Sequence, residues 1–172
     1  MPVWIDKGVF ALPAPEVPLI CVGPGTGVAP LRSLLSQRAA LQSAGSAGAP
    51  GMLFFGCRNA AKDWLHAQEM QRWQQCGVLD ADSGLQTAFS RDHSSKVYVQ
   101  HRIRECAAAL WRMLAENGAH VFVSGSANSM PAAVAAAFEQ VIAQGAGCDA
   151  AAAKRSLAQL MRAGRYRVEA WS

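Results

Sequence analysis

Five short runs with apolar centres alternate along the chain with longer segments in which apolar residues recur at helical spacing. The runs at residues 17–23, 52–57, 85–91 and 120–125 predict strands. The fifth run, residues 166–171, alternates apolar and polar positions and predicts a closing strand. Strands that alternate with helices predict an α/β fold, a doubly wound, five-stranded and mostly parallel sheet.

Between these runs the sequence predicts helices. The first follows the opening strand and reaches about Ala44, and a loop of small residues covers 43–51. A single helix is predicted over 63–75, with its aromatic rings in the core. The residues that recur at helical spacing are Trp64, Ala67, Met70 and Trp73; Ile103, Cys106, Ala107, Leu110 and Leu114; Met130, Val134, Ala137, Val141 and Ile142; and Leu157, Leu160 and Met161.

Polar, mostly glycine-containing turns follow the first four predicted strands. They read GPGTGVAP at 23–30, GCRN at 56–59, SRDHSSK at 90–96 and SGSANSMP at 124–131. Ligands of doubly wound sheets bind outside the carboxyl ends of the strands. We therefore expect the functional site where these four turns meet.

The first turn has the composition of an anion-binding loop. Its glycines open a helix, whose first N–H groups and positive dipole end attract a phosphate. It is neither a Walker loop nor the usual G-x-G-x-x-G turn, because Val28 occupies the position of the third glycine. A tight turn without a ligand is the alternative. The residues predicted to hold a pyrophosphate are Gly23, Pro24, Gly25, Thr26 and Gly27.

The turn after the third predicted strand supplies groups for a second phosphate. Arg91 can grip it through two N–H bonds, Lys96 adds a charge and Ser90 a hydroxyl, while the ring of Tyr98 can stack on a base. After the second strand stands Arg58, where an NAD site would use an acidic residue for the ribose diol. The combination predicts NADP rather than NAD. A solvent-exposed basic loop is the alternative.

Charge and cysteine content narrow the function classes. The net charge is +4, from 16 basic and 12 acidic side chains, and aromatic residues do not interleave with the basic ones, which argues against a nucleic-acid binder. Five scattered cysteines without a C-x-x-C pair indicate neither a disulfide framework nor a zinc site, so no metal is expected. Neither a membrane span nor a signal peptide is predicted, and we expect a cytoplasmic protein without membrane partners.

The motifs GPGTGVAP, FFGCR, AFSR followed by KVYVQ, SGSANSMP and the terminal EAWS occur together in this order. In this the chain resembles the NADPH-binding domains of the cytochrome P450 reductase class, which are ferredoxin–NADP reductase-like diflavin enzymes. The motifs are most similar to those of the diflavin reductases of cytosolic iron–sulfur protein assembly. The resemblance implies NADPH binding here, hydride transfer to FAD, and electron flow through FMN to an anamorsin-like iron–sulfur protein.

The resemblance also implies roles for particular residues. Trp171 is implied to lie against the flavin ring, with Ser124 and Glu169 as the other catalytic candidates. Both depart from the P450 reductase pattern, which has Cys-Gly-Asp where this chain has Ser-Gly-Ser, and aspartate in place of Glu169. The further nucleotide contacts it implies are Gln100, Gly125, Ser126, Met130 and Trp171 itself.

The same resemblance sets the expected domain boundaries. Residues 1–17 are expected to be the tail of an FAD domain or a linker, and residues 18–172 the NADP(H)-binding domain. The chain is then an excised C-terminal domain whose partners are the FAD and FMN domains, and it is inactive alone. Two alternatives stay open: the NADPH domain of a P450 or sulfite reductase, and a nucleotide-sensing domain without chemistry.

Overall fold

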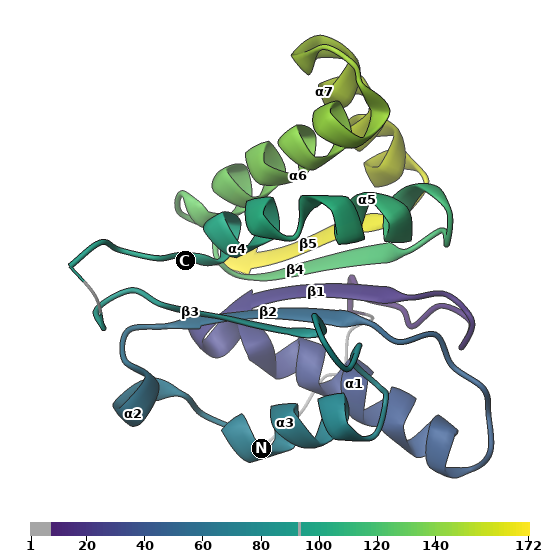
Figure 1. The fold of residues 1–172 in the computed structure, drawn as a ribbon, viewed down its shortest axis with the longest axis vertical. Coiled ribbons are helices and arrows are strands. Elements are labelled where there is room, and N and C mark those ends of the chain that lie inside the picture. Colours follow the sequence, from purple (N-terminus) through teal and green to yellow (C-terminus); the bar gives the residue numbers. More distant parts are fainter. Residues whose placement is uncertain (1–7, 93) are drawn as a thin grey trace, which may run out of the picture.

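The computed structural model describes residues 8–92 and 94–172 and contains a five-stranded sheet with helices on both faces (Figure 1). All four pairs of neighbouring strands are parallel, in the order β3-β2-β1-β4-β5. The predicted doubly wound sheet is therefore confirmed, and its described strands are parallel throughout. The strands are β1 (Leu19–Pro24), β2 (Met52–Cys57), β3 (Leu85–Phe89), β4 (His120–Ser126) and β5 (Tyr166–Trp171).

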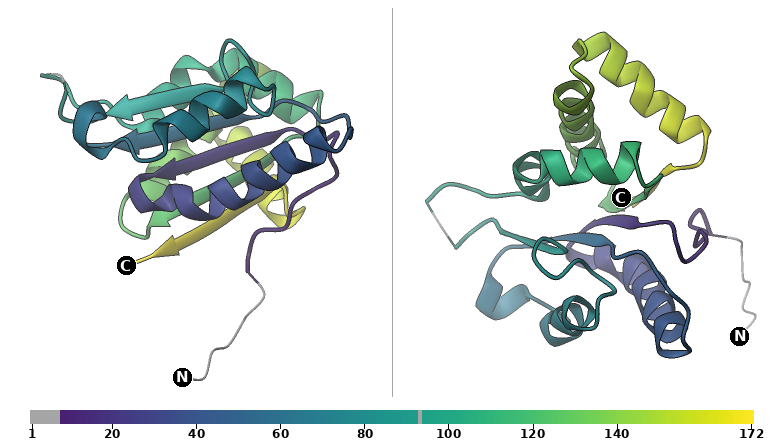
Figure 2. Two further views of the ribbon diagram at one scale, coloured as in Figure 1. Left: turned by 90° about the horizontal axis from the view of Figure 1, so that it is seen from below. Right: turned by 45° about the vertical axis from the view of Figure 1, so that its right-hand side comes forward.

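The helices form two layers, one on each face of the sheet (Figure 1). One layer contains α1 (Val28–Ser43), which follows the 3₁₀ turn η1 (Gly25–Gly27), α2 (Ala60–Asp63) and α3 (Ala67–Gln75). The other contains α4 (Val99–Glu105), α5 (Ala107–Ala115) and α6 (Met130–Ala146), with α7 (Ala150–Arg162) packed on α6 (Figures 1 and 2).

Both faces of the sheet are buried, which explains why the central strands read as continuous apolar runs. Along β1, Leu19 and Cys21 pack with the α1 and α3 side, whereas Ile20 and Val22 pack with the α4 to α6 side. Neither set is exposed by more than 2%. The largest fully buried side chains are Phe54, Phe55, Phe122 and Phe138.

Two predicted helices differ from the structure. The single helix over 63–75 is wrong: Trp64 leaves the helical region at ψ 74°, His66 is left-handed at φ 63°, and the segment divides into α2 and α3. The break lets the Trp64 ring pack on Phe89, 5.4 Å away between centroids. The second helical pattern forms two helices, α4 and α5, that meet at Cys106 and keep a common buried face.

Residues 8–17 lie along this domain, while residues 1–7 of the expected tail lie outside the described residues (Figure 2). The Phe10 ring contacts Phe122 edge to face at 5.1 Å. The side chain of Arg38, 4% exposed, donates from Nη2 to the carbonyl oxygens of Pro13, Ala14 and Val17 at 3.1, 2.8 and 3.0 Å.

None of the helices in the described parts of the chain combines the length and the apolar character that a membrane span needs.

Candidate functional site

A pocket of about 740 Å³ opens at the carboxyl edge of the sheet, where β1, β2 and β4 end. This is the edge where a doubly wound sheet binds its ligands, beside the point where the strand order reverses between β1 and β4. All four predicted turns contribute to it. The lining residues are Pro24, Gly25, Thr26, Phe55, Gly56, Cys57, Arg58, Lys62, Asp63, Leu65, Ala88, Ser90, Tyr98, Val99, Gln100, Ser126, Ser129, Met130 and Ala133.

The structure brings nine of the predicted nucleotide contacts together in this lining, and the others are not part of it. Those inside are Pro24, Gly25, Thr26, Arg58, Ser90, Tyr98, Gln100, Ser126 and Met130. Predicted residues that lie outside the described lining are Gly23, Gly27, Arg91, Lys96, Ser124, Gly125, Glu169 and Trp171.

Sequence reasoning missed part of the lining. Lys62 lies four residues after Arg58 and close behind the second predicted strand. A second cation so near to Arg58 was a signal that could have found it. The apolar floor, formed by Phe55, Ala88 and Val99, carries no signal that separates it from the core, because all three side chains are also buried.

Two glycines of the first turn are required for different reasons. Gly25 has φ +58°, and a Cβ built on it would meet nothing within 4 Å, so its need is conformational. A Cβ on Gly27 would lie 2.1 Å from the carbonyl oxygen of Ser124, so its need is close packing of the turn against β4. No side chain caps the start of η1 or α1. Pro24, Gly25 and Thr26 of this turn line the pocket.

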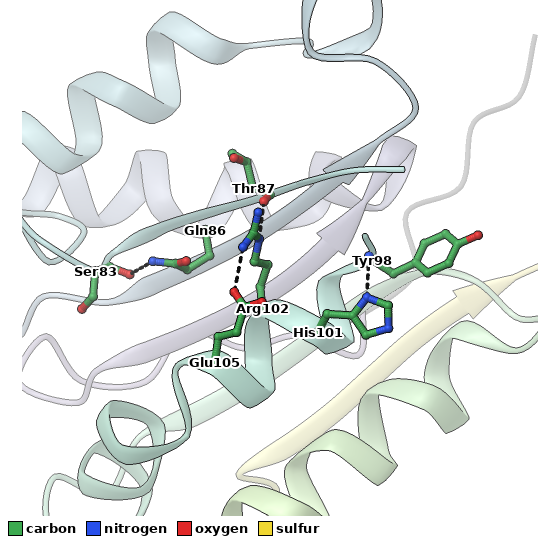
Figure 3. Close-up of polar contacts among 7 residues, drawn as sticks. All are labelled: Ser83, Gln86, Thr87, Tyr98, His101, Arg102 and Glu105. Carbon is green, nitrogen blue, oxygen red and sulfur yellow. Dashed lines mark hydrogen bonds and ion pairs between the residues drawn. The ribbon is translucent and has the colours of Figure 1, made fainter. Parts of the chain in front are cut away.

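Tyr98 is presented to the pocket by the start of α4, which is fastened to β3 (Figure 3). Arg102 makes the fastening: its Nε donates to the carbonyl oxygen of Thr87 at 2.9 Å, and its Nη1 pairs with Glu105 at 2.7 Å. The backbone N–H of Tyr98 donates to Nδ1 of His101 at 3.2 Å. The Tyr98 ring lies beside the His101 ring, 5.9 Å away between centroids, and 42% of the residue is exposed, so it presents an open surface on which a planar ligand can stack.

The three catalytic candidates lie on the two neighbouring strands β4 and β5. Ser124 pairs with Glu169 in the strand register, and Ser126 pairs with Trp171. Ser124 is fully buried, and its hydroxyl has no hydrogen-bond partner among the described residues. Trp171 is 42% exposed, and its carbonyl oxygen accepts the N–H of Ala127 at 2.8 Å. An exposed indole therefore stands at the edge where the turns gather.

Titratable groups in the lining have distinct environments. Burial raises the pKa of the Cys57 thiol to about 11, and the carboxylates of Asp63 and Asp92 make smaller contributions in the same direction. Cys57 therefore remains a neutral thiol near pH 7. Arg58 and Lys62 are both exposed, so both cations are available to an anion in the pocket. Asp63 is the carboxylate among the lining residues, and its Oδ2 accepts the N–H of Asn59 at 3.0 Å.

Comparison with known proteins gives consistent matches. Residues 21–136 match the family model described as "Oxidoreductase NAD-binding domain". Over its full length the chain is 44% identical to NADPH-dependent diflavin oxidoreductase 1 of Arabidopsis thaliana and 39% identical to the zebrafish (Danio rerio) protein of the same name. It is 39% identical to the NADPH–cytochrome P450 reductase of rabbit (Oryctolagus cuniculus). The chain spans 28%, 28% and 25% of these relatives, respectively.

Proposed function

The chain belongs to the oxidoreductase NAD-binding domain family, and we propose that it binds NADPH and presents the nicotinamide for hydride transfer to FAD in a diflavin reductase. One observation carries the proposal. A single pocket at the carboxyl edge of the sheet joins the glycine turn, the cations Arg58 and Lys62, the hydroxyl of Ser90 and the exposed ring of Tyr98.

The groups present fit NADPH. The glycine turn offers backbone N–H groups at a helix start for the pyrophosphate. Arg58, Lys62 and Ser90 form a cationic, hydroxyl-bearing wall for the 2′-phosphate. Arg91 and Lys96, exposed on the loop after β3, would add their charges to it. Asp63 also lines the pocket, and its Oδ2 accepts the N–H of Asn59 in its own loop, so the two cations of this wall outnumber its carboxylate.

We also propose roles for residues around the reacting end. NADPH, when bound, supplies a hydride that carries two electrons to FAD and leaves NADP⁺. Trp171, exposed at the end of β5, would cover the flavin ring and would have to yield to the nicotinamide. Glu169, in register with Ser124, places a carboxylate on the adjacent strand. Ser124 has a buried hydroxyl without a hydrogen-bond partner among the described residues.

For the longer protein we propose the reductase type of cytosolic iron–sulfur assembly. FAD and FMN domains would belong to the same chain, and an anamorsin-like iron–sulfur protein would accept the electrons. The 44% identity to a plant diflavin oxidoreductase and the Ser-Gly-Ser sequence of β4 favour this type. All five cysteines are free, which fits a reducing cytoplasm.

A cytochrome P450 reductase is the second candidate, because the rabbit enzyme is 39% identical over the whole chain. Stopped-flow reduction of the two acceptors by the longer protein distinguishes them. Faster reduction of the iron–sulfur protein supports the assembly role, and faster reduction of a cytochrome P450 overturns it.

The nucleotide specificity is tested on the 172-residue chain. We expect calorimetric titration to give tighter binding of NADP⁺ than of NAD⁺. Arg91→Ala should weaken NADP⁺ binding about tenfold, since one charge-assisted hydrogen bond to phosphate is lost, and change NAD⁺ binding less than twofold. Arg155→Ala is the matched control, because Arg155 occupies an exposed position of α7. Equal affinities of the unmodified chain for the two nucleotides would overturn the proposal.

A further inference from the structure

The loops that follow β2 and β3 leave the sheet side by side. The parallel ladder, which pairs Cys57 with Phe89, continues for two more hydrogen bonds. The N–H of Ser90 donates to the carbonyl oxygen of Cys57, and that of Arg91 to the carbonyl oxygen of Arg58, both at 2.9 Å. Arg58 and Arg91 therefore start from neighbouring points at the rim of the pocket.

Beyond these two bonds, the loops are joined by the side chain of Asp92. Its Oδ1 accepts from Nδ2 of Asn59 at 2.8 Å, and its Oδ2 accepts from the N–H of Ala60, the first residue of α2, at 2.9 Å. The Asn59 side chain makes no capping bond to α2 itself. The start of α2 is thus held by a carboxylate from the loop after β3, 32 residues away in the sequence.

The position of α2 determines where one wall of the pocket stands. Arg58 comes just before this helix and Lys62 lies within it, and both line the pocket. Ser90, on the other loop, lines it as well, whereas Asp92 is outside the described lining. A four-residue helix has little stability of its own, so a tertiary contact has to hold it.

We propose that Asp92 is a positioning residue for the 2′-phosphate subsite. It fixes the loop of Arg58 and Lys62 against the loop of Ser90 and Arg91, so that the phosphate meets donors already in place. Preorganised donors bind more tightly because less conformational freedom is lost on binding. This inference rests on the proposed NADP(H) function.

Simple electrostatics predicts the opposite sign. A carboxylate near a phosphate repels it, so removing the charge of Asp92 should strengthen phosphate binding if the side chain has no positioning role. Two variants separate these effects. Asp92→Ala removes both the charge and the hydrogen bonds. Asp92→Asn removes the charge but can still accept from Ala60, and its amide can donate to the Asn59 carbonyl oxygen once that side chain turns.

The experiment measures dissociation constants of NADP⁺ and NAD⁺ for the whole chain by calorimetry. Asp92→Ala should weaken NADP⁺ binding about threefold to tenfold, from the loss of two solvent-exposed, charge-assisted hydrogen bonds, with less than a twofold change for NAD⁺. Asp92→Asn should restore NADP⁺ affinity to within about twofold. Asp82→Ala, which removes an exposed aspartate from the loop before β3, is the control and should change neither constant.

Three results would overturn the positioning role. They are unchanged or tighter NADP⁺ binding by Asp92→Ala, an equal loss for both nucleotides, and failure of Asp92→Asn to restore affinity. Loss of NADP⁺ preference in the unmodified chain is a different result, because it overturns the proposed function and this inference with it.

Discussion

Replacing Gly27 with alanine should destabilise the protein more than the same change at Gly25, two residues earlier. The new Cβ at position 27 would lie 2.1 Å from the carbonyl oxygen of Ser124 and 2.8 Å from the Cα of Gly125. Ordinary contacts begin near 3.4 Å, so the turn and β4 have to separate by about 1.3 Å. Both partners are backbone and cannot yield by rotating a side chain, which places the cost near the upper end for overpacking, about 3 kcal/mol.

At Gly25 the cost is conformational. The left-handed φ of +58° disfavours a Cβ by about 1 kcal/mol, while the surrounding space is open. For a chain of this size, about 1 kcal/mol lowers Tm by roughly 2–4 °C, so Gly27→Ala should lower it by roughly 6–12 °C. Urea unfolding followed by circular dichroism gives both free energies. The packing argument fails if Gly27→Ala costs no more than Gly25→Ala.

Three further changes test other contacts. Arg38→Met should destabilise the chain by about 2–4 kcal/mol, because three carbonyl groups lose their donor. Hydrogen exchange of residues 13–17 should accelerate, and unchanged exchange would contradict this prediction. Cys57 should resist alkylation at pH 8, because a pKa of about 11 leaves about one thiolate in a thousand, and it should react as the pH rises toward 11. Mass spectrometry that compares the alkylation of Cys57 with that of the exposed Cys76 checks this. Asp149→Ala removes the cap of α7, whose carboxylate accepts from Ala152 at 2.7 Å, and should cost about 1 kcal/mol in urea unfolding, unlike Asp82→Ala.

The central strands β1, β2 and β4 were predictable because burial on both faces makes each of them an apolar run. The last strand, residues 166–171, was predicted from its alternation and matches the prediction at both ends. The helix breaks were not. Periodicity reports which side chains face the core, and Met70 and Trp73 keep that spacing in α3 whether or not the helix extends back to Asp63. The break depends on the contact between Trp64 and Phe89, which the sequence separates by a whole helix and strand.

The candidate site divides in the same way. Its turns were predictable because glycine allows backbone conformations that other residues avoid and proline fixes φ, and the topology of the sheet then brings the turns to one edge. The burial of Ser124 was not predictable, because it follows from how closely Gly27 approaches β4. The hydrogen bond from the N–H of Ala60 to Asp92 was not predictable either, because an exposed aspartate in a basic loop looks like an ordinary surface charge in the sequence.

The contact of Arg38 with residues 13–17 has a consequence for how this chain tolerates mutation. Its Nη2 donates to carbonyl oxygens alone, so it recognises the path of the segment rather than its side chains. Carbonyl groups are common to every amino acid, and substitutions at Ala14 or Val17 that preserve the path leave the contact intact. Arg38 has no such freedom, because no other side chain supplies a charged donor of that reach and planarity. Sequence drift should therefore be tolerated along the segment and rejected at Arg38, the buried side chain that makes these three hydrogen bonds.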